Sequence, residues 1–78
     1  MVATIRIKVS LHGVFRIDRF KVQVLEYPTG TTAREVIDVL EIPAALLGTV
    51  VINGIHADSE KILSDGDTLM LLPLLEGG

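Results

Sequence analysis

Residues 32–41 read TAREVIDVLE, and this segment organises the rest of the chain because it predicts a single amphipathic helix. Thr32 and Glu35 have the spacing of a capping box, in which each side chain accepts a hydrogen bond from the other residue's backbone N–H. The apolar residues that follow the cap recur at helical spacing and form one stripe: Ala33, Val36, Ile37 and Leu40. Pro43 restricts the residue before it, so we expect the helix to end near Glu41.

Two strands are expected before this helix. From Thr4 to Leu11 apolar and polar residues alternate, which is typical of a strand with one buried face. Residues 14–19 lack this alternation and predict a wide loop. A second alternation follows, and it puts on the buried side of its strand Phe20, Val22 and Val24.

Further strands are expected after the helix. Residues 50–52 are β-branched throughout, and Asn53-Gly54, which follows them, is the commonest dipeptide of a tight hairpin turn. A short segment at residues 55–57 pairs back through that turn. Residues 65–67 read Asp-Gly-Asp and predict another turn, which leads into a last strand at residues 68–72.

This order of elements predicts an α+β fold of the β-grasp type, in which a mixed four- to five-stranded sheet packs on one main helix. We expect one core, made of Ile5, Ile7, Val9, Val22, Val24, Val36, Ile37, Leu40, Val50, Ile52, Leu69 and Leu71. Residues 1–73 form the β-grasp domain in this interpretation. Residues 74–78 form a flexible C-terminal tail that ends in Gly77 and Gly78.

Size and composition limit the function classes. A chain of 78 residues has little room for an enclosed catalytic pocket, so an autonomous enzyme is a poor fit. A net charge of −3 and only three aromatic residues argue against nucleic acid as a partner. The sequence has no cysteine, no leader pattern and no long apolar run, so we expect a cytoplasmic protein that does not insert into a membrane.

Strand geometry predicts a partner surface beside the tail. If Val50 and Ile52 point into the core, Val51 points outward, and the same parity turns Met70 and Leu72 outward on the neighbouring strand. With Leu74 and Leu75 these three residues make a contiguous exposed apolar patch, which we take as the candidate partner-binding surface.

Four short motifs carry a resemblance to a known family. They are VING at residues 51–54, SDGDTL at 64–69, Leu72-Pro73, and the terminal Gly77-Gly78. With them the chain resembles, over essentially its whole length, the ubiquitin-like sulfur carriers, a group that includes the small subunit of molybdopterin synthase and the thiamine-pathway carrier.

The resemblance implies a chemistry for the tail. The Gly78 carboxylate would be adenylated by a partner similar to ubiquitin-activating enzymes and then converted into a thiocarboxylate that donates sulfur. Gly77 and Gly78 would matter because residues without side chains can enter a narrow channel. The chain would act as a protein cosubstrate rather than an enzyme, with no bound cofactor, while the partner enzyme uses ATP. A second partner, the molybdopterin synthase large subunit or the thiazole synthase, would receive the sulfur.

Within this family the features point in two directions. The wide first loop with Phe15 and Arg16, together with Pro73, resembles the molybdopterin (or tungstopterin) type. The short stretch at residues 41–49 is closer to the thiamine type, and residues 74–76 depart from the Pro-rich approach of the molybdopterin type. We therefore expect a carrier for molybdopterin synthesis. The alternatives are a thiamine thiazole carrier, a ubiquitin-like modifier of lysines, and a β-grasp binding module with an incidental tail.

The remaining polar residues have simpler interpretations. His12 and His56 have no companions at ligand spacing, so we expect both on the surface and no metal site. Asp65 and Asp67 flank a glycine, which indicates a turn, because the full pattern of a calcium loop is missing.

Overall fold

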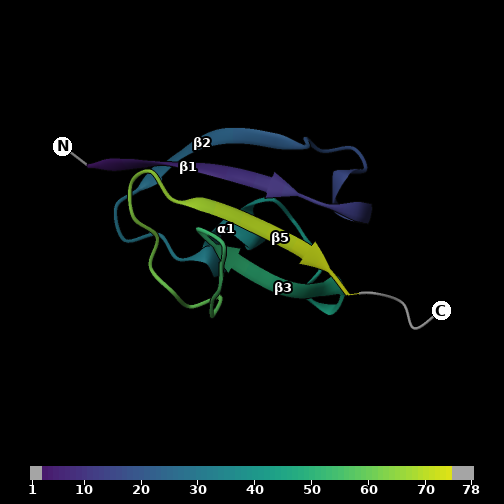
Figure 1. Cartoon of the computed structure of the whole chain (residues 1–78). Coiled ribbons are helices and arrows are strands. Elements are labelled where there is room, and N and C mark those ends of the chain that lie inside the picture. Colours follow the sequence, from purple (N-terminus) through teal and green to yellow (C-terminus); the bar gives the residue numbers. More distant parts are fainter. Residues whose placement is uncertain (1–2, 75–78) are drawn as a thin grey trace.

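The computed structural model describes residues 3–74, which form a sheet packed against one α-helix (Figure 1). The five strands are β1 (Thr4–Leu11), β2 (Val22–Pro28), β3 (Leu47–Ile52), β4 (Ile55–His56) and β5 (Thr68–Pro73). Their order in the sheet is β2-β1-β5-β3-β4, with β1 and β5 parallel and the other pairs antiparallel. The α-helix is α1 (Ala33–Val39), and two short 3₁₀ helices are η1 (Gly13–Arg16) and η2 (Ala44–Leu46). This mixed sheet with one α-helix confirms the predicted α+β β-grasp.

The capping box that predicted the helix is formed at its N-terminus. The Glu35 backbone N–H donates to the Thr32 hydroxyl at 3.2 Å, and the Thr32 N–H donates to the Glu35 carboxylate at 3.0 Å. The two bonds satisfy backbone donors that have no partner inside the helix. The Ala33 and Arg34 N–H groups donate to the Lys61 and Ser59 carbonyls, so the local motif marks the start of α1 and contacts with residues 59–61 complete it.

The C-terminus of α1 is closed by its own backbone and by the first loop. Glu41 adopts a left-handed conformation with φ 57°, and the next N–H, that of Ile42, donates back to the Ile37 carbonyl at 3.1 Å. The Arg19 guanidinium donates to the carbonyls of Leu40 and Glu41 at 3.1 and 3.0 Å. Because a cation at this end also complements the helix dipole, Arg19 holds the wide loop against the helix end.

The core lies between α1 and the inner face of the sheet. It contains most of the expected residues and adds several from loops and element ends, among them Leu11, Phe15, Ala33, Ile42 and Leu63. The side chain of Phe15 in η1 is buried, so the first loop closes one end of the core. Leu40 packs against this core but is only partly buried, which lowers the expected stability cost of shortening it.

The predicted inward face of the second strand was wrong for Val22 and Val24, whereas Phe20, which precedes β2, does pack against the core. Val22 and Val24 are 46% and 60% exposed, whereas Leu25 and Tyr27 pack against the core. The register pairs Leu25 with Ile7, and directly opposed residues in an antiparallel pair share one face of the sheet. Since both parities of this strand carry apolar residues, only the register decides which set is buried.

Within residues 3–74, no helix is both long and apolar enough to cross a membrane.

Candidate functional site

The outer face of β5 and β3 carries the apolar residues that the sequence singled out. The ladder places Met70 opposite Val51 and Leu72 opposite Thr49, and β5 then ends at Pro73. Met70 and Leu72 are half-buried, and Leu74 just beyond the strand is 56% exposed. We call Met70, Leu72 and Leu74 the apolar strip, because together they follow the outer face of β5 to its end.

The expectation that Val51 is exposed was wrong. Val51 does lie on the opposite face from Val50 and Ile52, since it is absent from the core cluster that contains both of them. Its exposed fraction is nevertheless only 8%. The cross-strand neighbours Met70 and His56 flank it on both sides, and longer side chains on either side leave a short valine little access to solvent. Val51 therefore lies between Met70 and His56 on the outer face of the sheet, and its role in partner binding stays a prediction.

We call Pro73 and Leu74 the tail root, and both are held by β3 and by η2, which precedes β3. The Leu74 N–H donates to the Leu46 carbonyl at 2.8 Å, one residue beyond the end of β5. The β3–β5 ladder shifts register between Leu47 and Thr49, so that Gly48 is left without a partner as in a β-bulge. Gly48 lies so close to the other strand that an added Cβ would be 2.9 Å from the Pro73 carbonyl oxygen.

The first loop touches the same root from the other side. A Cβ at Gly13 would lie 3.0 Å from the Pro73 ring, and Gly13 has φ +57°, a conformation that favours glycine. The Arg16 guanidinium Nε donates to the Leu11 carbonyl at 2.8 Å, which anchors η1 at the end of β1. The parallel strands β1 and β5 both end at this side of the sheet (Figure 1), so η1 and the tail root are neighbours.

The expected reactive residues lie beyond this root. Leu75, Gly77 and Gly78 are outside the described residues, and so is most of the tail assigned to residues 74–78. Their roles in chemistry and partner binding stay predictions. Leu74, the first residue of the expected tail, is tied to the body through its N–H.

The Asp-Gly-Asp turn and the Asn-Gly turn interlock at the far end of β5. The Asn53 side-chain amide donates to the Asp67 carboxylate at 2.8 Å, and its carbonyl accepts from the Thr68 N–H at 2.9 Å. The other Asp67 oxygen accepts from the Ser64 N–H at 2.8 Å. Asp65 accepts from the Arg6 N–H at the same distance. Both carboxylates bind backbone or amide donors, which confirms the interpretation of residues 65–67 as a turn.

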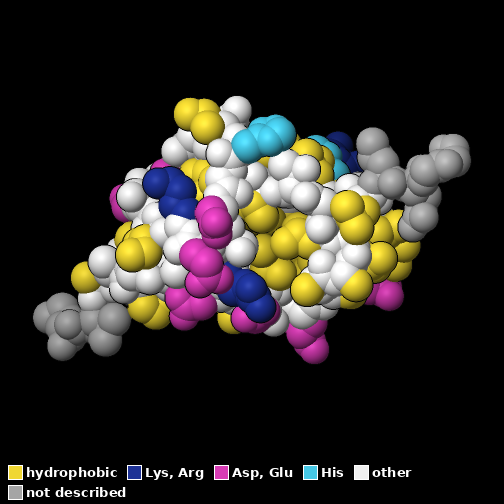
Figure 2. Space-filling model, turned by 90° about the horizontal axis from the view of Figure 1, so that it is seen from below, with side chains coloured by type: hydrophobic (Ala, Val, Ile, Leu, Met, Phe, Trp, Pro, Cys, Tyr) yellow, Lys and Arg dark blue, Asp and Glu magenta, His cyan; other side chains and the backbone are white. Residues whose placement is uncertain are grey.

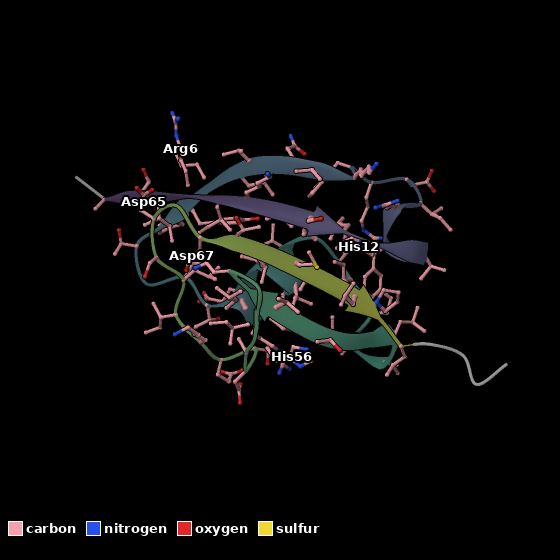
Figure 3. The ribbon with its side chains drawn as sticks, in the orientation of Figure 1. Arg6, His12, His56, Asp65 and Asp67 are labelled. Atoms are coloured by element: carbon pink, nitrogen blue, oxygen red, sulfur yellow. The ribbon has the colours of Figure 1, made fainter. Side chains whose placement is uncertain are left out.

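The two histidines do not form a site together. His12 follows β1 and lies within 3.2 Å of the Ser10 hydroxyl through its Nε2, while His56 belongs to the edge strand β4. Figure 3 shows the two histidines apart, with Arg6, Asp65 and Asp67 grouped at the opposite end of the sheet from His12. Among residues 3–74, no three His, Cys, Asp or Glu side chains are placed to hold a metal ion.

The surface seen from the β3 side also separates apolar from charged groups. Figure 2 shows hydrophobic side chains gathered towards the end of the sheet at which β5 stops, with acidic and basic side chains beside them. The exposed apolar residues include Leu46 in η2, whose carbonyl accepts the hydrogen bond from the Leu74 N–H. Exposed apolar side chains therefore lie on both partners of this hydrogen bond, Leu46 and Leu74.

Sequence reasoning found the apolar strip but missed the residues that hold the tail root. Gly13 and Leu46 belong to the 3₁₀ helices η1 and η2, Gly48 belongs to β3, and all three contact Pro73 or Leu74. These contacts leave no pattern in the sequence, because any residue offers the carbonyl that Leu46 provides, and a glycine needed for a close approach in space looks like any other glycine.

Comparison with known proteins supports the resemblance described above. The model of the ThiS family matches residues 14–78 of the chain. A comparison with the curated proteins found no match.

Several solved structures share the fold of this chain. The HVO 2177 protein of Haloferax volcanii superposes with a TM-score of 0.78 at 21% identity, over 96% of this chain and 88% of that one. The Pyrococcus furiosus protein named "Putative molybdopterin converting factor, subunit 1" gives 0.75 at 20% identity, over 91% and 99%. SAMP1 of Haloferax volcanii gives 0.75 at 18% identity, over 94% and 99%. At these identities the likeness establishes the shared fold.

Proposed function

The chain belongs to the ThiS family of ubiquitin-like sulfur carriers, and on that premise we propose that its Gly78 carboxylate is adenylated and then converted into a thiocarboxylate. The observation that carries the proposal is the path from the apolar strip to the end of β5. That path gives a partner a surface to bind directly beside the segment that leads to Gly77 and Gly78. The chain then acts as a protein cosubstrate and not as an enzyme.

The first chemical step makes the carboxylate reactive. A carboxylate oxygen of Gly78 attacks the α-phosphorus of ATP, the bond to the bridging oxygen breaks, and pyrophosphate leaves with the electron pair. The product is an acyl-adenylate, whose leaving group is AMP instead of oxide. ATP is bound by the activating enzyme, because the sequence contains no phosphate-binding glycine loop.

The second step introduces sulfur. Hydrosulfide, or a donor at the same oxidation level, attacks the acyl carbon, and the bond to AMP breaks with its electron pair going to AMP. Loss of the thiol proton leaves the thiocarboxylate. Sulfur held in this form cannot diffuse away, and it remains nucleophilic for the acceptor.

This chemistry requires two partner proteins. One is an adenylating enzyme similar to ubiquitin-activating enzymes, and the other accepts the sulfur. We assign the acceptor as the large subunit of a molybdopterin (or tungstopterin) synthase, because the wide first loop, with η1 packed against Pro73, matches that type of carrier. The short connection at residues 41–49 favours the thiazole synthase of thiamine synthesis as the second candidate. We place the carrier in the cytoplasm.

Intact mass measures the proposed modification directly. The protein is incubated with the activating enzyme, ATP and sulfide, and it should gain the mass difference between one sulfur and one oxygen, located at Gly78 by fragmentation. The matched control carries one extra residue after Gly78, which moves the carboxylate by about 3.5 Å and leaves the body unchanged. Equal sulfur incorporation into the extended chain would show that the tail is not the site.

The acceptor is identified by transfer from the modified carrier. Thiocarboxylated protein is mixed with either the molybdopterin synthase large subunit and its pterin precursor or the thiazole synthase and its substrates. Loss of the sulfur increment together with formation of the dithiolene product supports the first assignment. Turnover with the thiazole synthase alone would assign the carrier to thiamine synthesis.

A further inference from the structure

Gly48 and the tail root make a contact that depends on the absence of a side chain. An added Cβ would stand 2.9 Å from the Pro73 carbonyl oxygen, 3.0 Å from the Pro73 carbonyl carbon and 3.0 Å from the Leu74 nitrogen. All three are backbone atoms, which cannot move aside as the end of a flexible side chain could. Gly48 is not among the glycines with positive φ, so its backbone conformation is open to other residues and only this contact requires glycine.

The same contact coincides with two features that set the direction of the chain. The register shift at Gly48 bends one strand of the ladder, as a β-bulge does. One residue after Pro73, the Leu74 N–H donates a 2.8 Å hydrogen bond to the Leu46 carbonyl. This bond holds the last backbone unit before the end of the described residues. We call Gly48, Leu46 and the Pro73–Leu74 backbone the root clamp.

We infer that Gly48 is a positioning residue, which through the root clamp aims the tail so that the Gly78 carboxylate reaches the reacting phosphorus of ATP in the activating enzyme. The role rests on the proposed function. Four residues follow Leu74, and even fully extended they span at most about 14 Å. At that span, turning the root by about 4° moves the end of the chain sideways by about 1 Å.

The size of the effect follows from the contact. An alanine at residue 48 must push the Pro73–Leu74 backbone away by a few tenths of an ångström or more, which weakens or breaks the Leu74 hydrogen bond. Misplacing a reacting group by about 1 Å can slow a reaction by about 10²-fold. We therefore expect Gly48→Ala to lower the rate of adenylate formation by that order, while the affinity for the activating enzyme, set by the apolar strip, is unchanged.

Gly30→Ala is the matched control for stability. Gly30 has φ +96° and open space around its Cα, so alanine strains the backbone there without touching the root clamp. This variant should lose stability and keep the wild-type rate. Hydrogen exchange of the Leu74 amide gives a second readout that does not depend on the partner: exchange should accelerate in Gly48→Ala and stay slow in Gly30→Ala.

A second pair of variants isolates the hydrogen bond itself. Leu74→Pro removes the N–H that donates to Leu46, whereas Leu74→Ala shortens the side chain and keeps the donor. Both change the apolar strip, so any loss of affinity should be shared. Only Leu74→Pro should add a loss in the rate at saturating carrier.

The kinetic measurement separates the possible outcomes. Adenylation is followed by pyrophosphate release at saturating carrier, and the dissociation constant is measured without ATP. A lower kcat with unchanged affinity supports the positioning role. A wild-type kcat in Gly48→Ala, or a rate loss matched by an equal loss of affinity, overturns it. If the wild-type protein itself is never modified, the proposed function fails and the positioning role fails with it; modification of wild type and Gly48→Ala at equal rates removes only the positioning role.

Discussion

Replacing Asn53 tests how the two interlocked turns hold the register of β3 against β5. Asn53→Gly removes the hydrogen bond to the Asp67 carboxylate at 2.8 Å and the bond accepted from the Thr68 N–H at 2.9 Å. It leaves the backbone free to keep the left-handed conformation, in which Asn53 has φ 54° and Gly54 has φ 81°. The variant therefore removes the side-chain bonds without straining the folded backbone, and the greater freedom of glycine in the unfolded chain adds to the loss.

The magnitude follows from the type of each bond. A neutral hydrogen bond contributes about 1 kcal/mol and one to a charged group about 1.5 kcal/mol at the lower end of its range, which suits a solvent-exposed turn. We expect Asn53→Gly to lose about 2 kcal/mol of unfolding free energy, since the two contributions overlap in one small network. Asn53→Ala should lose about 1 kcal/mol more, because a residue with a Cβ is strained in the left-handed conformation.

Urea unfolding followed by circular dichroism measures both variants on the same scale. The free energy is obtained by linear extrapolation, and an unchanged m-value indicates that the same surface is exposed on unfolding. A loss below about 0.5 kcal/mol for Asn53→Gly would refute the contribution of the side-chain bonds. Equal losses for the glycine and alanine variants would refute the strain at residue 53.

Four further changes test other parts of the molecule. Leu71→Ala should cost about 2–5 kcal/mol because its side chain is fully buried, whereas Val24→Ala should cost under about 0.5 kcal/mol in the same urea assay. Leu72→Glu should weaken binding to the activating enzyme in calorimetry without unfolding the domain, with Val24→Glu, on the same face of the sheet at its far edge, as the control. Gly78→Val should abolish sulfur incorporation by intact mass, since a β-branched residue restricts the backbone and widens the tail. Burial raises the pKa of Tyr27 above its ordinary 10.0, because the folded state favours the neutral phenol. The contribution of Tyr27 to the unfolding free energy should be fully present below pH 10 and be lost as the pH rises through the folded pKa. Alkaline unfolding and the absorbance of this single tyrosine measure the effect.

Features encoded in a few neighbouring residues were predictable from the sequence. The capping box at Thr32 and Glu35 fixed the start of α1, and Asn53-Gly54 fixed the hairpin between β3 and β4, because each motif satisfies its own backbone groups or torsions locally. The alternation from Thr4 to Leu11 gave both the bounds and the buried face of β1, since only one parity of that strand is apolar. The order of these elements was enough to predict the β-grasp, and the terminal motifs were enough to indicate its family.

Features that depend on which segments meet in space were decided only by the tertiary structure. From the sequence, either Val22 and Val24 or Leu25 and Tyr27 could pack inward. The pairing with β1 determines that Leu25 and Tyr27 face the core. Val51 is on the face that the sequence indicated, yet its neighbours from β4 and β5 cover it. The root clamp joins Gly48 to Pro73 and Leu74 by backbone proximity across two strands. No side-chain pattern records that proximity, because what matters at Gly48 is the space a side chain would have filled.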